Sequence, residues 1–153
     1  MSLDATDKKI ITLLQHDASL SLQQLSEQLN LTSTPCWNRI KRLENEGVIQ
    51  KRVALIAPEK VGLELVAFVQ IKTQQHSEIW LRNCVQQVKG FAQVLEFYRM
   101  AGEYDYLLKV IVKDMRSYDQ FYQQLVNDVA GLTDVNTSFA MQQLKFTTEL
   151  PII

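Results

Sequence analysis

The sequence contains few of the residues that cross-link small proteins or bind metals. It has two cysteines, Cys36 and Cys84, and two histidines, His16 and His76, among 153 residues. The cysteines have neither the spacing of metal ligands nor enough partners for a disulfide scaffold. The histidines are equally isolated along the chain. We therefore predict no disulfide framework, no metal site and no bound cofactor.

Long hydrophobic runs are also absent. No stretch approaches the roughly 20 uninterrupted apolar residues that a membrane-spanning helix needs, and the N-terminal region is acidic where a secretory signal would be basic. These absences predict a cytoplasmic protein that makes no membrane contact. With 46% apolar residues, the chain can form one medium domain or two small ones, and oligomerisation would help two small cores.

A strongly basic composition is missing too, because the formal net charge is -1. The charge is unevenly distributed, however. Residues 1–57 carry seven Lys and Arg against six Asp and Glu, whereas residues 58–153 carry nine against eleven. Within residues 39–52, five cations accompany only Glu44 and Glu46. A local patch of this size supports a few phosphate contacts per subunit, and an oligomer would multiply them.

Residues 20–47 contain two short helical patterns separated by a tight turn, which predicts a helix-turn-helix. Each pattern has a single apolar stripe at helical spacing. The stripes are formed by Leu22, Leu25 and Leu29, and by Cys36, Ile40 and Leu43. An earlier stripe, formed by Ile10, Leu13 and Leu14, predicts a third helix that shares the same small core. A DNA-binding protein is the first hypothesis.

Residues at the predicted helix ends agree with this interpretation. Asp4 can cap the first helix, and Ser21 with Gln24 forms a capping box for the second. Thr32 can cap the third helix, which Gly47 then ends because glycine tolerates a positive φ. We therefore place a helix-turn-helix domain at residues 1–50.

The outward face of the third helix is polar and cationic, as a helix in the major groove requires. Trp37 lies on this face, where it can contact a base or sugar or cover the junction between helices. We predict that the bases are contacted by Ser33, Thr34, Trp37 and Asn38, and the phosphates mainly by Arg39, Lys41, Arg42, Lys51 and Arg52.

The rest of the chain has a different periodicity. Residues 48–57 predict a strand, and Pro58 and Gly62 mark a hinge, so residues 51–62 are assigned to a hinge strand and linker. Residues 63–153 then alternate strands and helices in the order βαββαβ, with strands at 65–73, 91–100, 106–112 and 135–146. Ser77 and Asp114 cap the two helices. The prediction is an α+β chain with an N-terminal, winged-helix-like helix-turn-helix domain and a C-terminal, ferredoxin-like split βαβ domain.

In the predicted C-terminal domain, two helices cover one face of a four-stranded sheet and leave the other face open. The strands carry apolar residues on both faces, as in VAFVQI and LLKVIV. One explanation is that the helix-covered face forms the core and that the apolar residues on the open face occur there by chance. Exposed apolar surface more often marks a binding partner. We therefore predict a homodimer formed sheet to sheet, which would also pair two DNA-binding units.

Three segments resemble one known family. The segments TPCWNRIKRLENEGVI, RVALIAPEKVGL and MAGEYDYLLKV occur in the order and spacing of the leucine-responsive and asparagine-regulator (Lrp/AsnC, feast-famine) transcription factors of bacteria and archaea. The resemblance covers essentially the whole chain. It implies a DNA-binding regulator, assembled as a dimer and further to an octamer or another higher oligomer, whose DNA occupancy or assembly responds to an amino acid.

The resemblance also implies where that effector binds. In the family the site lies near the loop between the second and third strands, at interfaces between subunits. Here the implied effector-binding residues are Ala101, Gly102, Glu103, Tyr104 and Asp105, with Thr137 and Ser138 in the last strand. From sequence alone, Gly102 to Asp105 is also compatible with an ordinary hairpin turn. Likeness to cysteine-responsive members makes L-cysteine the leading effector; leucine, methionine, another amino acid or no effector stays open.

The sequence also contains residues that suggest other functions. Glu103 and Asp105 are close enough for acid and base catalysis, but no nucleophile, metal cluster or phosphate loop accompanies them, so we expect no enzyme. Cys36 is a candidate redox switch, although its place on an apolar stripe favours a small buried residue. A small-molecule-binding module whose helix-turn-helix contacts protein instead of DNA is the alternative from another class.

Overall fold

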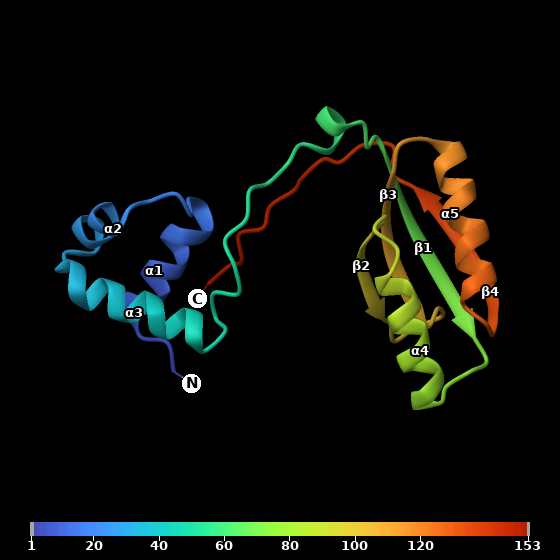
Figure 1. The fold of residues 1–153 in the computed structure, drawn as a ribbon, viewed down its shortest axis with the longest axis horizontal. Coiled ribbons are helices and arrows are strands. Elements are labelled where there is room, and N and C mark those ends of the chain that lie inside the picture. Colours follow the sequence, from blue (N-terminus) through green and yellow to red (C-terminus); the bar gives the residue numbers. More distant parts are fainter. Residues whose placement is uncertain (1, 153) are drawn as a thin grey trace. The chain divides into compact units, whose positions relative to one another are not determined.

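The computed structural model describes residues 2–152. The chain forms two compact units (Figure 1). The first unit contains the residues up to Leu55 and, from the other end of the chain, those from Lys145 onward; the second unit spans Ile56–Leu144. The boundary between Leu55 and Ile56 falls within the predicted linker at residues 51–62, and the C-terminal segment groups with the first unit.

Three helices make up most of the first unit: α1 (Ala5–His16), α2 (Leu22–Leu29) and α3 (Ser33–Asn45). Their apolar stripes meet in one core formed by Ile10, Leu14, Leu25, Cys36, Ile40 and Leu43. Asn30, with a left-handed φ of 52°, ends α2 and turns the chain toward α3. The predicted helix-turn-helix is thus confirmed, with only a few residues between α2 and α3.

The helix ends follow the predicted caps with one exception. Asp4 and Asp7 form a capping box at α1, and Ser21 and Gln24 form another at α2. Thr32 is the N-cap residue of α3, but its side chain makes no capping hydrogen bond. The predicted hydroxyl cap is therefore wrong, and α3 depends more heavily on its packing.

The predicted strand at residues 48–57 is also wrong. Residues 51–57, all of which the structure describes, are exposed and form no strand. The apolar run from Val53 to Ala57 is compatible with a strand, but a strand requires a hydrogen-bonded neighbour, and none is present within the described chain. A short 3-10 helix, η1 (Pro58–Val61), follows and ends at Gly62, which has a positive φ of 76°.

The second unit has the predicted βαββαβ order. Its elements are β1 (Leu65–Thr73), α4 (Glu78–Lys89), β2 (Val94–Arg99), β3 (Tyr106–Val112), α5 (Met115–Asp128) and β4 (Leu132–Phe139). The strands form one antiparallel sheet in the order β2-β3-β1-β4. The last strand was predicted at residues 135–146, but β4 ends at Phe139. It pairs with β1, which begins at Leu65, and the final pairing is Ala67 with Phe139.

The two faces of the sheet differ in their covering. Side chains of β1 alternate, so that Ala67, Val69 and Ile71 are buried against α4 and α5. Phe68 lies on the opposite face and is 38% exposed, and Tyr98 on the same face is 49% exposed. The predicted open face with apolar side chains is therefore present within this unit.

Among the described residues, no helix combines the length and the hydropathy that spanning a bilayer requires.

A matched pair of substitutions tests the two caps. Ser21→Ala removes the hydroxyl that accepts the Gln24 N–H and should lower the stability of the first unit by about 1 kcal/mol. Thr32→Ala removes no capping bond and should cost less than about 0.5 kcal/mol. Urea unfolding followed by helix circular dichroism measures both, and equal losses would contradict the assignment of the caps.

Candidate DNA-binding surface and effector site

The residues predicted to contact bases lie on the outward face of α3. Ser33, Thr34, Trp37 and Asn38 are all exposed there, and Trp37 is 49% exposed. Trp37 therefore does not lie in the core between the helices. The buried stripe of Cys36, Ile40 and Leu43 fixes which side of α3 faces outward, because residues three and four apart share one face of a helix.

Two of the predicted phosphate-binding arginines are engaged inside the unit. Asp7 of α1 is fully buried, and its carboxylate accepts hydrogen bonds from Arg39 (Nη1 to Oδ1, 2.8 Å) and Arg42 (Nη2 to Oδ2, 2.5 Å) of α3. Arg39 also donates to Asp4 at 2.6 Å, and this contact raises the pKa of Arg39. These charge-assisted bonds connect the start of α1 to the middle of α3.

Sequence analysis missed the role of Asp7, although a signal was present. Asp7, Ile10 and Leu14 fall at i, i+3 and i+7 and are all buried, so Asp7 occupies an apolar stripe. A carboxylate at such a position needs a cationic partner, because an unpaired buried charge is costly. Which of the cations between residues 39 and 52 would supply it depends on the packing of α1 against α3.

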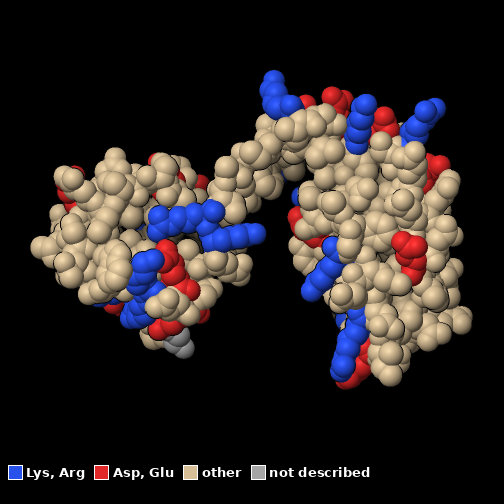
Figure 2. Space-filling view, in the orientation of Figure 1, with Lys and Arg blue, Asp and Glu red and all other residues tan. Residues whose placement is uncertain are grey.

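The remaining cations of the patch are exposed. Lys41 donates to Glu44 at 2.8 Å, Arg52 lies 3.4 Å from the other oxygen of Glu44, and Lys51 is also exposed. The hydrogen bond from Lys41 holds the pKa of Glu44 below its usual value. Figure 2 shows basic and acidic side chains interleaved on this unit. Exposed ion pairs are weak, so phosphate can replace Glu44 as the partner of Lys41.

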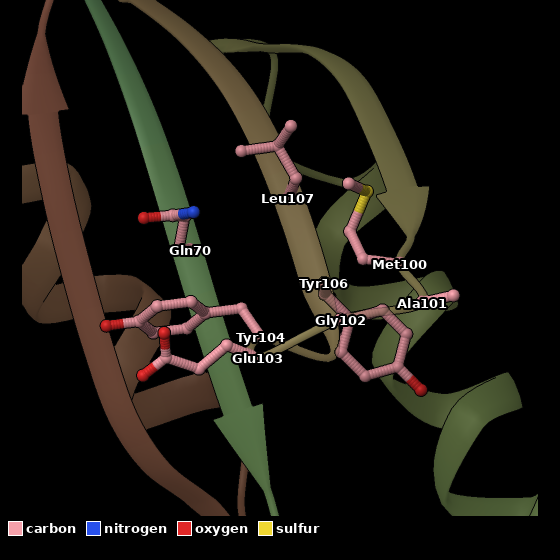
Figure 3. Close-up of a pocket in the computed structure, with 8 residues that line it drawn as sticks. All are labelled: Gln70, Met100, Ala101, Gly102, Glu103, Tyr104, Tyr106 and Leu107. Atoms are coloured by element: carbon pink, nitrogen blue, oxygen red, sulfur yellow. The ribbon is translucent and has the colours of Figure 1, made fainter.

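A cavity of about 300 Å³ lies at the loop between β2 and β3 (Figure 3). Four of the seven predicted effector residues line it: Ala101, Gly102, Glu103 and Tyr104. The other lining residues are Gln70 of β1, Met100, Tyr106 and Leu107. Gly102 leaves open space, since a Cβ there would meet nothing within 4 Å.

Polar contacts position the side chains of this loop. The Lys72 ammonium lies 3.1 Å from Oε1 of Glu103 and 4.7 Å from the ring centre of Tyr104. The bond to Glu103 raises the pKa of Lys72. The hydroxyl of Tyr104 accepts a 3.2 Å hydrogen bond from the Asn136 side chain of β4. Lys72 and Asn136, from the adjacent strands β1 and β4, therefore orient two cavity residues.

Asp105 supports the loop instead of lining the cavity. Its carboxylate accepts the Thr73 backbone N–H at 2.8 Å, and its own backbone N–H donates to Ile71 at 2.9 Å. The Met100 N–H donates to the Asp105 carbonyl at 2.8 Å. With its carboxylate committed to β1, Asp105 is a poor partner for a ligand. Glu103 is the acidic residue that faces the cavity.

The two residues predicted in the last strand do not line the cavity. Thr137 pairs with Val69 on the helix-covered face, and its hydroxyl is hydrogen-bonded to that of Tyr118. Ser138 pairs with Phe68 on the open face. Adjacent residues of a strand point to opposite faces, so Thr137 and Ser138 lie on different faces of the sheet.

Sequence analysis missed Gln70, Met100, Tyr106 and Leu107. Met100 and Tyr106 directly flank the predicted loop, and Gln70 is a polar residue within an otherwise apolar stretch of β1. These were the available signals. Leu107 is placed by its antiparallel pairing with Gln70.

Both cysteines are buried and unpaired with each other. Cys36 is fully buried in the helical core, as its apolar stripe predicted. Burial raises the pKa of the Cys36 thiol, and it raises the pKa of Cys84 to about 11. Neither thiol has the lowered pKa of a reactive cysteine.

A helix-turn-helix with an exposed polar helix, followed by a unit with a small ligand cavity, defines a ligand-responsive DNA-binding regulator. Family models agree: residues 3–50 match a winged helix-turn-helix DNA-binding domain, and residues 66–150 match the Lrp/AsnC ligand binding domain. The chain belongs to the Lrp/AsnC family of transcriptional regulators. The predicted family is confirmed, and these domains belong to regulators, not enzymes.

Known relatives extend over nearly the whole chain. The DNA-binding transcriptional activator DecR of Escherichia coli is 58% identical and matches 98% of this chain and 99% of its own length. The glutamate uptake regulatory protein of Zymomonas mobilis is 47% identical over 98% of this chain and 91% of its own. The DNA-binding domain matched at residues 3–50 and the likeness to a DNA-binding activator favour a DNA-binding regulator over a module that contacts only protein.

Solved structures agree with the fold of the whole chain. An AsnC family regulator from Agrobacterium tumefaciens has a TM-score of 0.93 at 45% identity, covering 97% of this chain and 96% of that one. A transcriptional regulator from Neisseria meningitidis, solved as a complex with L-Met, has a TM-score of 0.90 at 33% identity, covering 98% and 97%.

The contrast between Arg39 and Lys41 is testable through stability. Arg39→Gln leaves the buried Asp7 with one guanidinium fewer and should destabilise the first unit by about 1–3 kcal/mol. Lys41→Gln breaks only an exposed pair and should cost less than about 1 kcal/mol. Urea unfolding of the two variants gives the difference directly, and an equal cost would argue against the structural role of Arg39.

Proposed function

We propose that this protein is a cytoplasmic, homodimeric transcriptional regulator that binds L-cysteine at the cavity beside the loop between β2 and β3. The observation that carries the proposal is the cavity itself, which combines an acidic side chain, Glu103, with loop backbone and apolar side chains. It belongs to a family domain that binds ligands. Ligand binding at this site biases the assembly or orientation of subunits and thereby changes DNA occupancy.

On DNA, α3 enters the major groove with Ser33, Thr34, Trp37 and Asn38 nearest the bases. Lys41, Lys51 and Arg52 contact phosphates, and Arg42, which is 44% exposed at its side chain, adds a contact through the donors that Asp7 leaves available. Arg39 holds α3 in place from within the unit. Contacts to phosphate then set affinity, while contacts to base edges set specificity.

The role of Lys41 is tested by the salt dependence of DNA binding. Lys41→Ala should weaken binding to all DNA sequences and reduce the slope of log K against log salt by about one unit. Lys89→Ala, at the end of α4 in the other unit, is the charge-matched control and should leave the slope unchanged. Fluorescence anisotropy over a salt series measures both. An unaltered slope for Lys41→Ala removes this residue from the phosphate contacts.

For the effector, Glu103 is the proposed partner of the α-ammonium group. Backbone N–H groups of the loop at Gly102 receive the α-carboxylate. Met100 and Leu107 supply an apolar wall for a small thiol side chain. L-Methionine is the second candidate, because the regulator from Neisseria meningitidis was solved with L-Met. Leucine and other amino acids are further candidate effectors for the same binding site.

Calorimetry with L-cysteine tests the site. Gly102→Val places a branched side chain in the open space and should abolish binding while basal DNA binding persists. Glu103→Gln removes the negative charge and should weaken binding about 10- to 100-fold. Glu64→Gln, outside the cavity lining, is the matched control and should bind as the wild type does.

Undiminished affinity in Gly102→Val would contradict the loop assignment. A thermal-shift screen of the wild type with the twenty amino acids separates the site from the identity of its ligand. Stabilisation by methionine or leucine but not cysteine would change the effector and keep the cavity. No response to any amino acid would indicate a ligand-independent regulator.

The open face of the sheet supports the proposed dimer. Phe68, Tyr98 and Met100 are each more than a third exposed within one chain, and apolar patches of this kind mark interfaces. A two-fold axis through this face pairs two α3 helices for two half-sites on DNA. Further assembly to an octamer or another higher oligomer multiplies the modest positive charge of each unit.

A further inference from the structure

The C-terminal segment, residues 145–152, binds the helical unit through a paired set of backbone contacts. The side-chain amide of Gln15, near the end of α1, donates from Nε2 to the Leu150 carbonyl at 2.8 Å. Its Oε1 accepts the Leu150 N–H at 2.9 Å. A single side chain thus satisfies both backbone groups of one residue that lies 135 positions away.

A second contact fixes the position of the segment along α1. Nδ1 of His16 lies 2.9 Å from Oε1 of Glu149, and the Glu149 N–H donates to the Thr147 hydroxyl at 3.1 Å. The Leu150 side chain is 71% exposed. Attachment at this point therefore depends on directional hydrogen bonds instead of apolar burial, and such bonds select one register.

Residues 145–152 follow β4 in the chain, a few residues after its end at Phe139. β4 is a strand that contacts the loop at the cavity. β4 carries Asn136, whose side chain donates to Tyr104, and the chain leaves the second unit after Leu144. The first unit is thus joined covalently to the second at both of its ends, by residues 51–57 and by the segment that follows β4. Residues 51–57 are exposed and lack a strand or helix, so this connection alone restrains little.

We infer that residues 145–152 act as a strap and that Gln15 is the positioning residue that holds it, so that the DNA-binding unit is restrained by two connections instead of one. A unit with fewer orientations loses less entropy when a dimer aligns two recognition helices on DNA. The smaller loss of entropy on DNA binding depends on the proposed dimer. The strap itself is observed within a single chain.

The experiment compares full-length variants in two measurements. Gln15→Met keeps the length and helix propensity of the side chain but removes both hydrogen bonds. Gln23→Met, which removes an exposed bond to Glu27 on α2, is the matched control. Exchange of the Leu150 amide with deuterium should become about fivefold faster in Gln15→Met, as expected for one lost hydrogen bond, and stay unchanged in Gln23→Met.

DNA affinity then tests positioning. On a fragment selected by the wild-type protein, Gln15→Met should bind about three- to tenfold more weakly, with an unaltered salt slope, because Gln15 touches no phosphate in this scheme. Leu150→Pro, which removes the N–H that Gln15 accepts, should weaken binding in the same direction. The double variant should be no weaker than Gln15→Met, because both substitutions break one contact.

Two results would overturn the inference. Unchanged Leu150 exchange in Gln15→Met would mean that the strap is not attached in solution. Faster exchange with undiminished DNA affinity would mean that it is attached but positions nothing. Sedimentation of the wild type reports the dimer separately, so failure of the proposed assembly is distinguishable from failure of the strap.

Discussion

The recognition helix is held in place by one buried carboxylate. The core between the three helices is small, and apolar contacts are non-directional. Bonds from Arg39 and Arg42 to the two oxygens of Asp7 add directional constraints. Together with the buried stripe of Cys36, Ile40 and Leu43, they fix the rotation of α3 relative to α1 and therefore the face that α3 exposes. Because Asp7 also belongs to the capping box of α1, helix start and helix packing depend on the same residue.

Patterns that are local in sequence were predictable, and pairings between distant residues were not. The stripes at Leu25 and Ile40 and the caps at Asp4, Ser21 and Ser77 depend on neighbours within a few positions, and the structure confirms them. Residues 51–57 end in an apolar run that is compatible with a strand, but they have no hydrogen-bonded neighbour among the described residues. β4 ends before the predicted residue 146 for the same reason, because β1, with which it pairs, begins at Leu65 and offers few further residues for pairing.

The candidate effector site shows the same division. The loop from Ala101 to Tyr104 was located through its resemblance to a family motif, and the cavity contains it. Gln70 and Leu107 enter the cavity only because strand register places them beside that loop. Asp105 could not be separated from Glu103 by composition, because both are acids in one turn. Only the hydrogen bond from the Thr73 backbone shows that one carboxylate supports the loop while the other faces the ligand space.

The buried thiols have a consequence for the chemistry of sensing. Thiol–disulfide exchange requires an accessible thiolate. Cys36 is enclosed among the three helices, and the pKa of Cys84 is raised to about 11, so both are protonated at neutral pH. Cystine or another small disulfide finds no ready nucleophile on this protein. If L-cysteine is the effector, as proposed, its binding in the cavity is reversible and leaves no covalent mark on these two thiols.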